Sequence, residues 1–202
     1  MSAPAADAAT TKALAPRRRG ALLEPLLASL RLRRVSRQVP RGAVVADFGC
    51  GPEAANLRRM SARIGRGIGI DLTADRAEFG NVTVMPGDLC EGVPLDDHSM
   101  DCVISLAVIE HVESPAKMLA QAFRVLKPGG LLLMTNPTPR AKPVLEFLSF
   151  KLGIVSKDQI IDHKQYIGRR EMEGLLAAAG FVHVRCRTFQ WGMNLFSRAQ
   201  KP

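Results

Sequence analysis

The chain alternates between two kinds of segment from about residue 43 onward. Short apolar runs recur, and stretches with the 3.6-residue spacing of an amphipathic helix separate several of them. Short continuous apolar runs are typical of strands buried on both faces of a parallel sheet. The predicted strands are 43–48, 67–70, 82–84, 102–106, 131–134 and 181–184. Strands that alternate with helices predict an α/β fold, a mostly parallel sheet with helices on both faces.

Two of the predicted helices carry start or stop signals. One begins at Pro115, which suits a first helical position, with Ser114 as its N-cap. Its apolar positions are Leu119, Ala122, Phe123 and Leu126. The other ends at Gly180, a residue common just past a helix C-terminus. Its apolar positions are Met172, Leu175, Leu176 and Ala179.

A further helical pattern covers residues 25–37. Its apolar face is predicted from Leu26, Leu27 and Leu30, and its basic residues are Arg31, Arg33, Arg34 and Arg37. Two interpretations stay open at this point. The helix covers the core and its arginines are solvated, or its basic face contacts an anionic substrate or a membrane surface.

Composition divides the chain into a basic tail and a nearly neutral body. Residues 1–41 carry nine basic and two acidic residues, whereas the rest carries nineteen and seventeen. Residues 1–19 are predicted to be a disordered basic tail, and 20–202 a single domain. The sequence has no long apolar run of membrane-spanning length, and its four cysteines follow no disulfide or metal-ligand spacing. A cytoplasmic location is the simplest expectation.

Three acidic residues lie near the carboxyl ends of the first three predicted strands. Asp47 precedes the turn Gly49-Cys50-Gly51, where glycine lets a ligand approach the backbone closely. Asp71 ends the second strand and could accept hydrogen bonds from ribose hydroxyls, and Asp88 follows the third and could accept one from an adenine amino group. The glycines alone would also suit a nucleotide-binding dehydrogenase. A carboxylate at position 47, however, would face a positively charged amino group better than a pyrophosphate.

The order of these segments resembles the signature series of class I S-adenosylmethionine-dependent methyltransferases, in particular a small type-11-like methyltransferase domain of bacteria. The resemblance begins with residues 44–51, 69–71 and 87–89. Residues 100–112 resemble the fourth strand and following turn of that family, and 124–130 the loop before the fifth strand. It covers residue 43 to about residue 200.

The resemblance implies a Rossmann-like three-layer αβα sandwich. Its seven-stranded, mostly parallel sheet would have an antiparallel last strand, which residues 193–199 could supply. It also implies S-adenosyl-L-methionine as cofactor, with Asp47 and the glycine turn at its methionine part, Asp71 at the ribose and Ser105-Leu106 at the sulfonium. The implied cofactor-binding set is Asp47, Gly49, Cys50, Gly51, Asp71, Leu72, Asp88, Leu89, Ser105 and Leu106.

One residue departs from the family pattern. A third glycine often stands where this chain has Glu53. The carboxylate of Glu53 could lie in the first turn of the next helix, where it would suit the helix dipole, or it could narrow the cofactor pocket.

Candidates for catalysis are few, because methyl transfer mainly needs alignment of the acceptor and removal of a proton. His111, just after the fourth strand, could act as general base, and His163 is a second candidate. Either imidazole could instead be a structural hydrogen-bonding group. Glu110 and His111 resemble a metal-binding pair of some methyltransferases, but Ala107 replaces the first glutamate, so we expect no metal.

Residues 142–168 form an apolar insertion, either a lid over a hydrophobic substrate or a helix that covers the core. The preferred function is therefore O-methylation of a small-molecule, glycan or lipid-linked acceptor, with contact of the basic helix at a membrane surface as a further option. Asn136 follows the fifth strand rather than the fourth, which disfavours methylation of a nucleic-acid base. The alternatives are an RNA methyltransferase, favoured only by the basic segment, and a catalytically silent binding module, suggested by Glu53. The oligomeric state stays open.

Overall fold

The computed structural model describes residues 24–144 and 165–202. The predicted tail, most of the apolar insertion and His163 lie outside these residues. Within the two described ranges, no helix is both long and apolar enough to cross a membrane.

The fold is one mixed sheet of eight strands in the order β3-β4-β2-β1-β5-β6-β8-β7. The strands are β1 Val44–Phe48, β2 Arg66–Asp71, β3 Ala77–Phe79, β4 Val82–Pro86, β5 Met100–Leu106, β6 Leu126–Pro137, β7 Val182–Phe189 and β8 Asn194–Gln200. The described helices are α1 Glu24–Ser36, α2 Ala55–Met60, α3 Pro115–Val125 and α6 Arg169–Ala178. Five central strands run parallel, and β8 is antiparallel to both of its neighbours, as predicted for the last strand.

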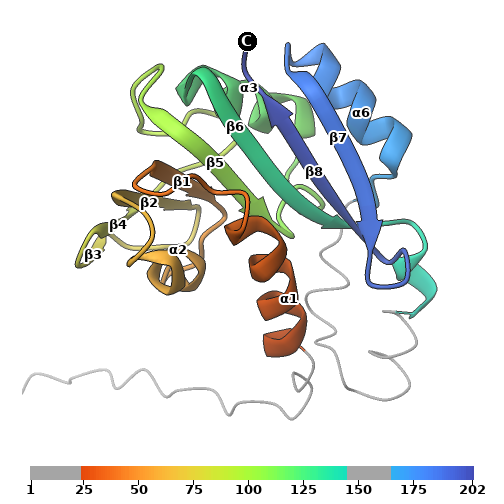
Figure 1. The fold of residues 1–202 in the computed structure, drawn as a ribbon, viewed down its shortest axis with the longest axis horizontal. Helices are drawn as coiled ribbons and strands as arrows, with labels where there is room; N and C mark the ends of the chain where they lie inside the picture. Colours follow the sequence, from red (N-terminus) through yellow and green to blue (C-terminus); the bar gives the residue numbers. More distant parts are fainter. Residues whose placement is uncertain (1–23, 145–164) are drawn as a thin grey trace, which may run out of the picture.

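Helices cover both faces of the sheet, so the molecule has the expected three layers (Figure 1). On one face, α1 and α2 bury Leu32, Val35 and Leu57 with the sheet. On the other face, α3 and α6 bury Leu119 and Leu176 in a second cluster. Parallel strands have to be covered on both sides, and these two apolar layers do so.

The local signals for α3 and α6 are confirmed. The side chain of Ser114 accepts a hydrogen bond from the Lys117 N–H at 3.3 Å, and Pro115 is the first residue of α3. Gly180 follows α6 with φ of +90°, a left-handed conformation that costs glycine little.

The sheet has one strand more than the seven expected. Residues 77–79 form β3, which pairs antiparallel with β4 through the turn Gly80-Asn81. Gly80 has φ of +63°, which a tight hairpin turn of this kind requires. Three residues give too short a run for the alternation of a strand to be visible in the sequence.

The predicted apolar face of α1 is wrong for Leu26 and Leu30, while Leu27 is half-buried. Leu32 and Val35 are buried, whereas Leu26 and Leu30 are 55% and 40% exposed. The helix therefore packs with a face rotated away from the leucines nearest its N-terminus. Arg31 is half-buried, and Arg34 stacks on the rings of Phe189 and Phe196 at 5.9 and 5.5 Å, so these two arginines are not simply solvated.

Candidate functional site

The predicted cofactor residues meet at one edge of the sheet. Strands β4, β2, β1 and β5 are parallel neighbours in that order, so their carboxyl ends lie side by side. Asp47 lies in β1, Asp71 ends β2, Asp88 follows β4 and Ser105 lies near the end of β5. Ligands of open α/β sheets bind at this edge.

The glycine turn after β1 is held against the end of β2. The Gly49 and Cys50 N–H groups both donate to the Ile70 carbonyl, at 2.8 and 3.3 Å. Gly49 has φ of +78°, and a Cβ there would lie 2.3 Å from a methyl carbon of Val108. At Gly51, with φ of +67°, a Cβ would meet nothing within 4 Å. Glycine is thus required at position 49 by packing, while position 51 leaves open space beside the backbone.

Asp71 is fixed in place by the turn it faces. One carboxylate oxygen, Oδ2, accepts from the Gly51 N–H at 2.9 Å. The other, Oδ1, accepts from the Thr73 N–H at 3.0 Å and from its hydroxyl at 2.8 Å. A carboxylate offers about four acceptor positions. Three of them are in use, so a ligand with two hydroxyls would have to displace the hydroxyl of Thr73. The side chain of Leu72 is 72% exposed beside this carboxylate.

Asp47 is the most unusual group of the site, because it is fully buried and pairs with no cation of the described residues. Its Oδ2 accepts a long hydrogen bond of 3.5 Å from the Asn56 amide, and its Oδ1 has no partner among the described residues. Burial raises the pKa of Asp47 to about 7, the amide of Asn56 lowers it, and the nearby charge of Asp71 raises it further. Asn56, in the first turn of α2, was not identified from the sequence.

Cys50 stays protonated at neutral pH and is therefore not a nucleophile. Desolvation, followed by the charges of Asp47 and Asp71, raises its pKa to about 12. A Cβ at Gly69 would lie 2.5 Å from its sulfur, so Cys50 packs tightly on β2.

The loop after β4 is bound to the end of β2. The Gly87 N–H donates to the Asp71 carbonyl at 3.1 Å. The Asp88 carboxylate accepts from the Cys90 N–H at 2.7 Å, which closes a local turn. Asp88 is half-buried. Leu89 is 7% exposed and lies in the buried cluster under α3, so its side chain serves the core.

The end of β5 brings a strained residue to the site. The buried Ser105 hydroxyl donates to the Phe48 carbonyl at 3.2 Å and so joins β5 to β1. Ala107 has φ of +58°, a left-handed conformation that is unusual for a residue with a Cβ. Leu106 is half-buried between them. Strain of this kind often occurs at functional sites.

His111 lies in the turn that follows. Its backbone N–H donates to the carbonyl of Val108, the residue that packs on Gly49, at 2.8 Å. Its side chain is half-buried and has at least one further interaction. His111 is therefore linked to the glycine turn through Val108, which accepts its N–H and packs on Gly49.

The neighbour of His111, Glu110, is a second buried carboxyl. It is 1% exposed, and its Oε2 has no hydrogen-bond partner among the described residues. Burial raises its pKa to about 7, and both a hydrogen bond from the backbone and the positive charge of Arg31 lower it. No local pattern in the sequence predicts that α1 brings Arg31 near this carboxyl.

Glu53 does not lie in the first turn of a helix. The helix α2 begins at Ala55, after Ala54 in a left-handed conformation. The Glu53 side chain is 79% exposed and lies 3.8 Å from the guanidinium of Arg58. A carboxylate turned to solvent in this way does not fill the open space at Gly51.

Asn136 lies on β6, the strand after β5, as the sequence indicated. It is fully buried, and its amide donates to the Pro137 and Ile167 carbonyls at 3.0 and 2.9 Å. Its role is to join β6 to the segment before α6.

The residues present fit an S-adenosylmethionine site. The Asp47 oxygen without a partner among the described residues would suit a ligand ammonium group, and the space beside the Gly51 backbone leaves that turn open to a ligand. Asp71 offers an acceptor and Leu72 an exposed apolar surface next to it.

Comparison with known proteins agrees with this geometry. Residues 46–134 match a family described as a methyltransferase domain. A probable S-adenosylmethionine-dependent methyltransferase of Mycolicibacterium smegmatis is 31% identical over 142 residues, which cover 60% of this chain and 51% of that protein. The chain thus spans about half the length of that relative.

The match covers a larger share of two further proteins. A demethylmenaquinone methyltransferase of Staphylococcus aureus is 26% identical over 180 residues, 77% of this chain and 74% of that protein. The solved structure of a S-adenosylmethionine-dependent methyltransferase from Thermotoga maritima has a TM-score of 0.66 at 20% identity, covering 87% of this chain and 89% of that one, which shows a shared fold. The chain therefore carries, over residues 46–134, a region that matches a methyltransferase domain, and it is similar to S-adenosylmethionine-dependent methyltransferases, which implies S-adenosylmethionine as the methyl donor.

Proposed function

We propose that this chain transfers a methyl group from S-adenosylmethionine to a hydroxyl oxygen of a small-molecule, glycan or lipid-linked acceptor. The observation that carries the proposal is Asp47, a fully buried carboxyl two residues before the glycine turn, whose Oδ1 has no partner among the described residues. A buried polar atom without a partner costs free energy unless a ligand supplies the partner.

The proposed cofactor contacts follow from the edge of the sheet. Asp47 pairs with the amino group of the methionine part, and Gly49–Gly51 lie along it. Asp71 accepts from the ribose through the acceptor position that Gly51 and Thr73 leave open. Asp88, at the loop bound to β2, accepts from the adenine amino group.

The chemistry needs little from the protein. S-adenosylmethionine, when bound, supplies a methyl group on a sulfonium that acts as the leaving group. The residues at the end of β5 align the acceptor, and His111 takes the hydroxyl proton. An imidazole suits this task because its ordinary pKa lies near neutral pH.

An apolar acceptor is supported by the exposed surface of α1. Leu26, Leu30 and Arg33 are spaced so that they share one stripe of α1, Arg37 follows in the turn after the helix, and all four are exposed. Apolar and basic side chains together favour contact with an anionic membrane surface. The Staphylococcus aureus relative, whose name gives demethylmenaquinone as its acceptor, supports the same class of substrate.

The test is incubation of the protein with methyl-labelled S-adenosylmethionine and an extract separated into lipid, glycan, RNA and metabolite pools. We expect label in the lipid, glycan or metabolite pool. The labelled methyl group should be in an ether linkage, which resists mild base. EDTA should not reduce the amount of label transferred. Label in RNA would favour the alternative of an RNA methyltransferase. Cofactor binding without transfer to any pool would indicate a silent binding module.

His111 is tested on the acceptor so identified. Because a positioned base contributes about 10²–10⁴-fold, His111→Asn should lower kcat by that factor and leave cofactor affinity nearly unchanged. His183→Asn, on the exposed surface of β7, is the control and should leave kcat as it is. A joint loss of cofactor affinity and thermal stability in the His111 variant would show a structural role instead.

A further inference from the structure

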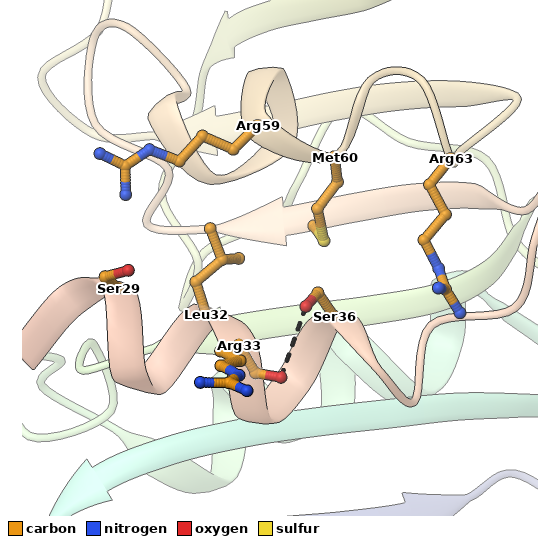
Figure 2. Close-up of a pocket in the computed structure, with 7 residues that line it drawn as sticks. All are labelled: Ser29, Leu32, Arg33, Ser36, Arg59, Met60 and Arg63. Carbon is orange, nitrogen blue, oxygen red and sulfur yellow. Dashed lines mark hydrogen bonds between the residues drawn. The ribbon is translucent and has the colours of Figure 1, made fainter.

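A cavity lies between α1 and α2, away from the glycine turn. Its volume is about 600 Å³. Figure 2 shows Leu32 and Met60 pointing toward each other from the two sides, with Arg59 and Arg63 on either side of Met60. Leu32 and Met60 are 7% and 4% exposed and belong to the core, so they form an apolar floor. Arg33 and Ser36 complete the wall on α1.

The charges around this cavity are all of one sign. Arg33, Arg59 and Arg63 line it, and no acidic residue does. Within the described part of the chain, none of the three makes an ion pair. Glu53, the acid nearest in sequence to Arg59, pairs with Arg58. Figure 2 draws the guanidinium groups of Arg59 and Arg63 on opposite sides of the cavity, so the three arginines give its rim a positive charge that attracts anions.

One of the three arginines is held rigidly. The Nε and Nη2 groups of Arg63 both donate to the Val39 carbonyl, at 3.3 and 2.9 Å. This bond fixes the guanidinium plane and leaves Nη1 for a ligand. Guanidinium groups bind phosphate oxygens through paired N–H donors, and a fixed plane loses less entropy on binding.

We propose that this cavity binds the phosphate group of a phosphate ester, with the arginines on the phosphate and the apolar floor against the ester carbon chain. The site is distinct from the proposed cofactor site, and it does not rest on the methyl acceptor. Two sources carry this chemistry: a soluble phosphorylated metabolite and the head group of an anionic phospholipid.

The experiment measures binding of two probes to the full chain by calorimetry. Glycerol 3-phosphate represents the soluble source, and monomeric dihexanoyl phosphatidylglycerol the lipid source. We expect at least one probe to bind, and the double variant Arg33→Gln/Arg59→Gln to lose at least tenfold in affinity. Tighter binding of the lipid probe assigns the site to a phospholipid, and tighter binding of glycerol 3-phosphate to a metabolite.

The matched control is Arg185→Gln/Arg187→Gln, which removes the same charge from the exposed surface of β7. It should bind both probes as the wild-type chain does. Equal losses in the two double variants would show general electrostatic attraction and overturn the site, as would the absence of binding of either probe at millimolar concentration. Affinity for S-adenosylmethionine, measured in the same samples, should be unchanged throughout, so a failure here is separable from a failure of the proposed function.

Discussion

At the residue scale, the site depends on carboxyl groups whose surroundings differ. Asp47 is fully buried, with a single long hydrogen bond, whereas Asp71 accepts three shorter bonds at the surface of the turn. The same side chain can therefore be poised for a ligand cation in one place and for neutral hydroxyls in the other.

Asp47 should make cofactor binding depend on pH. Its pKa of about 7 means that it is largely protonated below neutrality, whereas the ligand ammonium needs the ionised form. Binding must then release a proton, and affinity should fall about 15-fold between pH 7 and pH 5.5. Calorimetry in buffers of different ionisation enthalpy measures the released proton directly. Asp47→Asn should bind more weakly and lose this dependence, while Asp75→Asn, at an exposed position, should keep it.

Asp71→Ala should weaken binding of S-adenosylmethionine and of its demethylated product alike, because both carry the ribose. Loss of a charged acceptor costs about 1.5–3 kcal/mol, or roughly 10- to 150-fold in affinity. Thr73→Ala removes only the hydroxyl that competes for Oδ1, so it should not weaken binding. Equal affinity in the wild-type chain and Asp71→Ala would remove Asp71 from the ribose site.

At the element scale, the end of β8 is joined to the end of α3 by a single buried cation. Lys201 is 6% exposed, and its ammonium donates to the Phe123 and Arg124 carbonyls at 2.7 and 3.3 Å. It also lies 4.7 Å from the centre of the Phe123 ring. The last carbonyls of a helix lack partners within the helix, so a cation stabilises them.

Lys201→Met should therefore lower the free energy of unfolding by about 1–3 kcal/mol, since it removes the ammonium from the half-buried Phe123 carbonyl, while the Arg124 carbonyl keeps the His98 N–H. Urea denaturation measures the change. Lys142→Met, at an exposed position, should stay within about 0.5 kcal/mol of the wild-type chain. A similar small effect for Lys201→Met would mean that water replaces the ammonium.

At the scale of the whole molecule, buried carboxyls set how stability depends on pH. The pKa values of Glu110 and Asp47 are raised to about 7, so the folded chain binds protons more tightly than the unfolded chain. The contribution of these two groups to stability is then largest at acid pH and falls as pH rises from about 4 to about 7. The fall is up to about 3 kcal/mol for Glu110 and about 4 kcal/mol for Asp47.

Glu110→Gln should remove its share of the pH dependence. The variant should be more stable than the wild-type chain at pH 8, and the difference should shrink toward pH 5. Glu78→Gln, exposed on β3, should follow the wild-type curve. Thermal unfolding between pH 5 and pH 8 gives both curves, and parallel curves for Glu110→Gln and wild type would show that Glu110 keeps its ordinary pKa when folded.

The sequence by itself determined the order of strands and helices, because buried strands and amphipathic helices have different apolar periods. It also placed Asp47, the glycine turn and Asp71 at consecutive strand ends, and parallel strands bring such ends to one edge. Helix start signals identified Ser114 as an N-cap. The order of the strands placed Asn136 on the fifth predicted strand, whereas a nucleic-acid methyltransferase would need it after the fourth.

Only the tertiary structure decided which face of α1 is buried, because Leu26 and Leu32 are equally apolar and the sheet selects between them. It alone brought Asn56 to Asp47, Arg31 to Glu110, and the arginines of α1 and α2 around one cavity. Such contacts join side chains from different elements, so the spacing of apolar residues within one element does not predict them. Burial and the pKa shifts that follow from it depend on the packed chain as a whole.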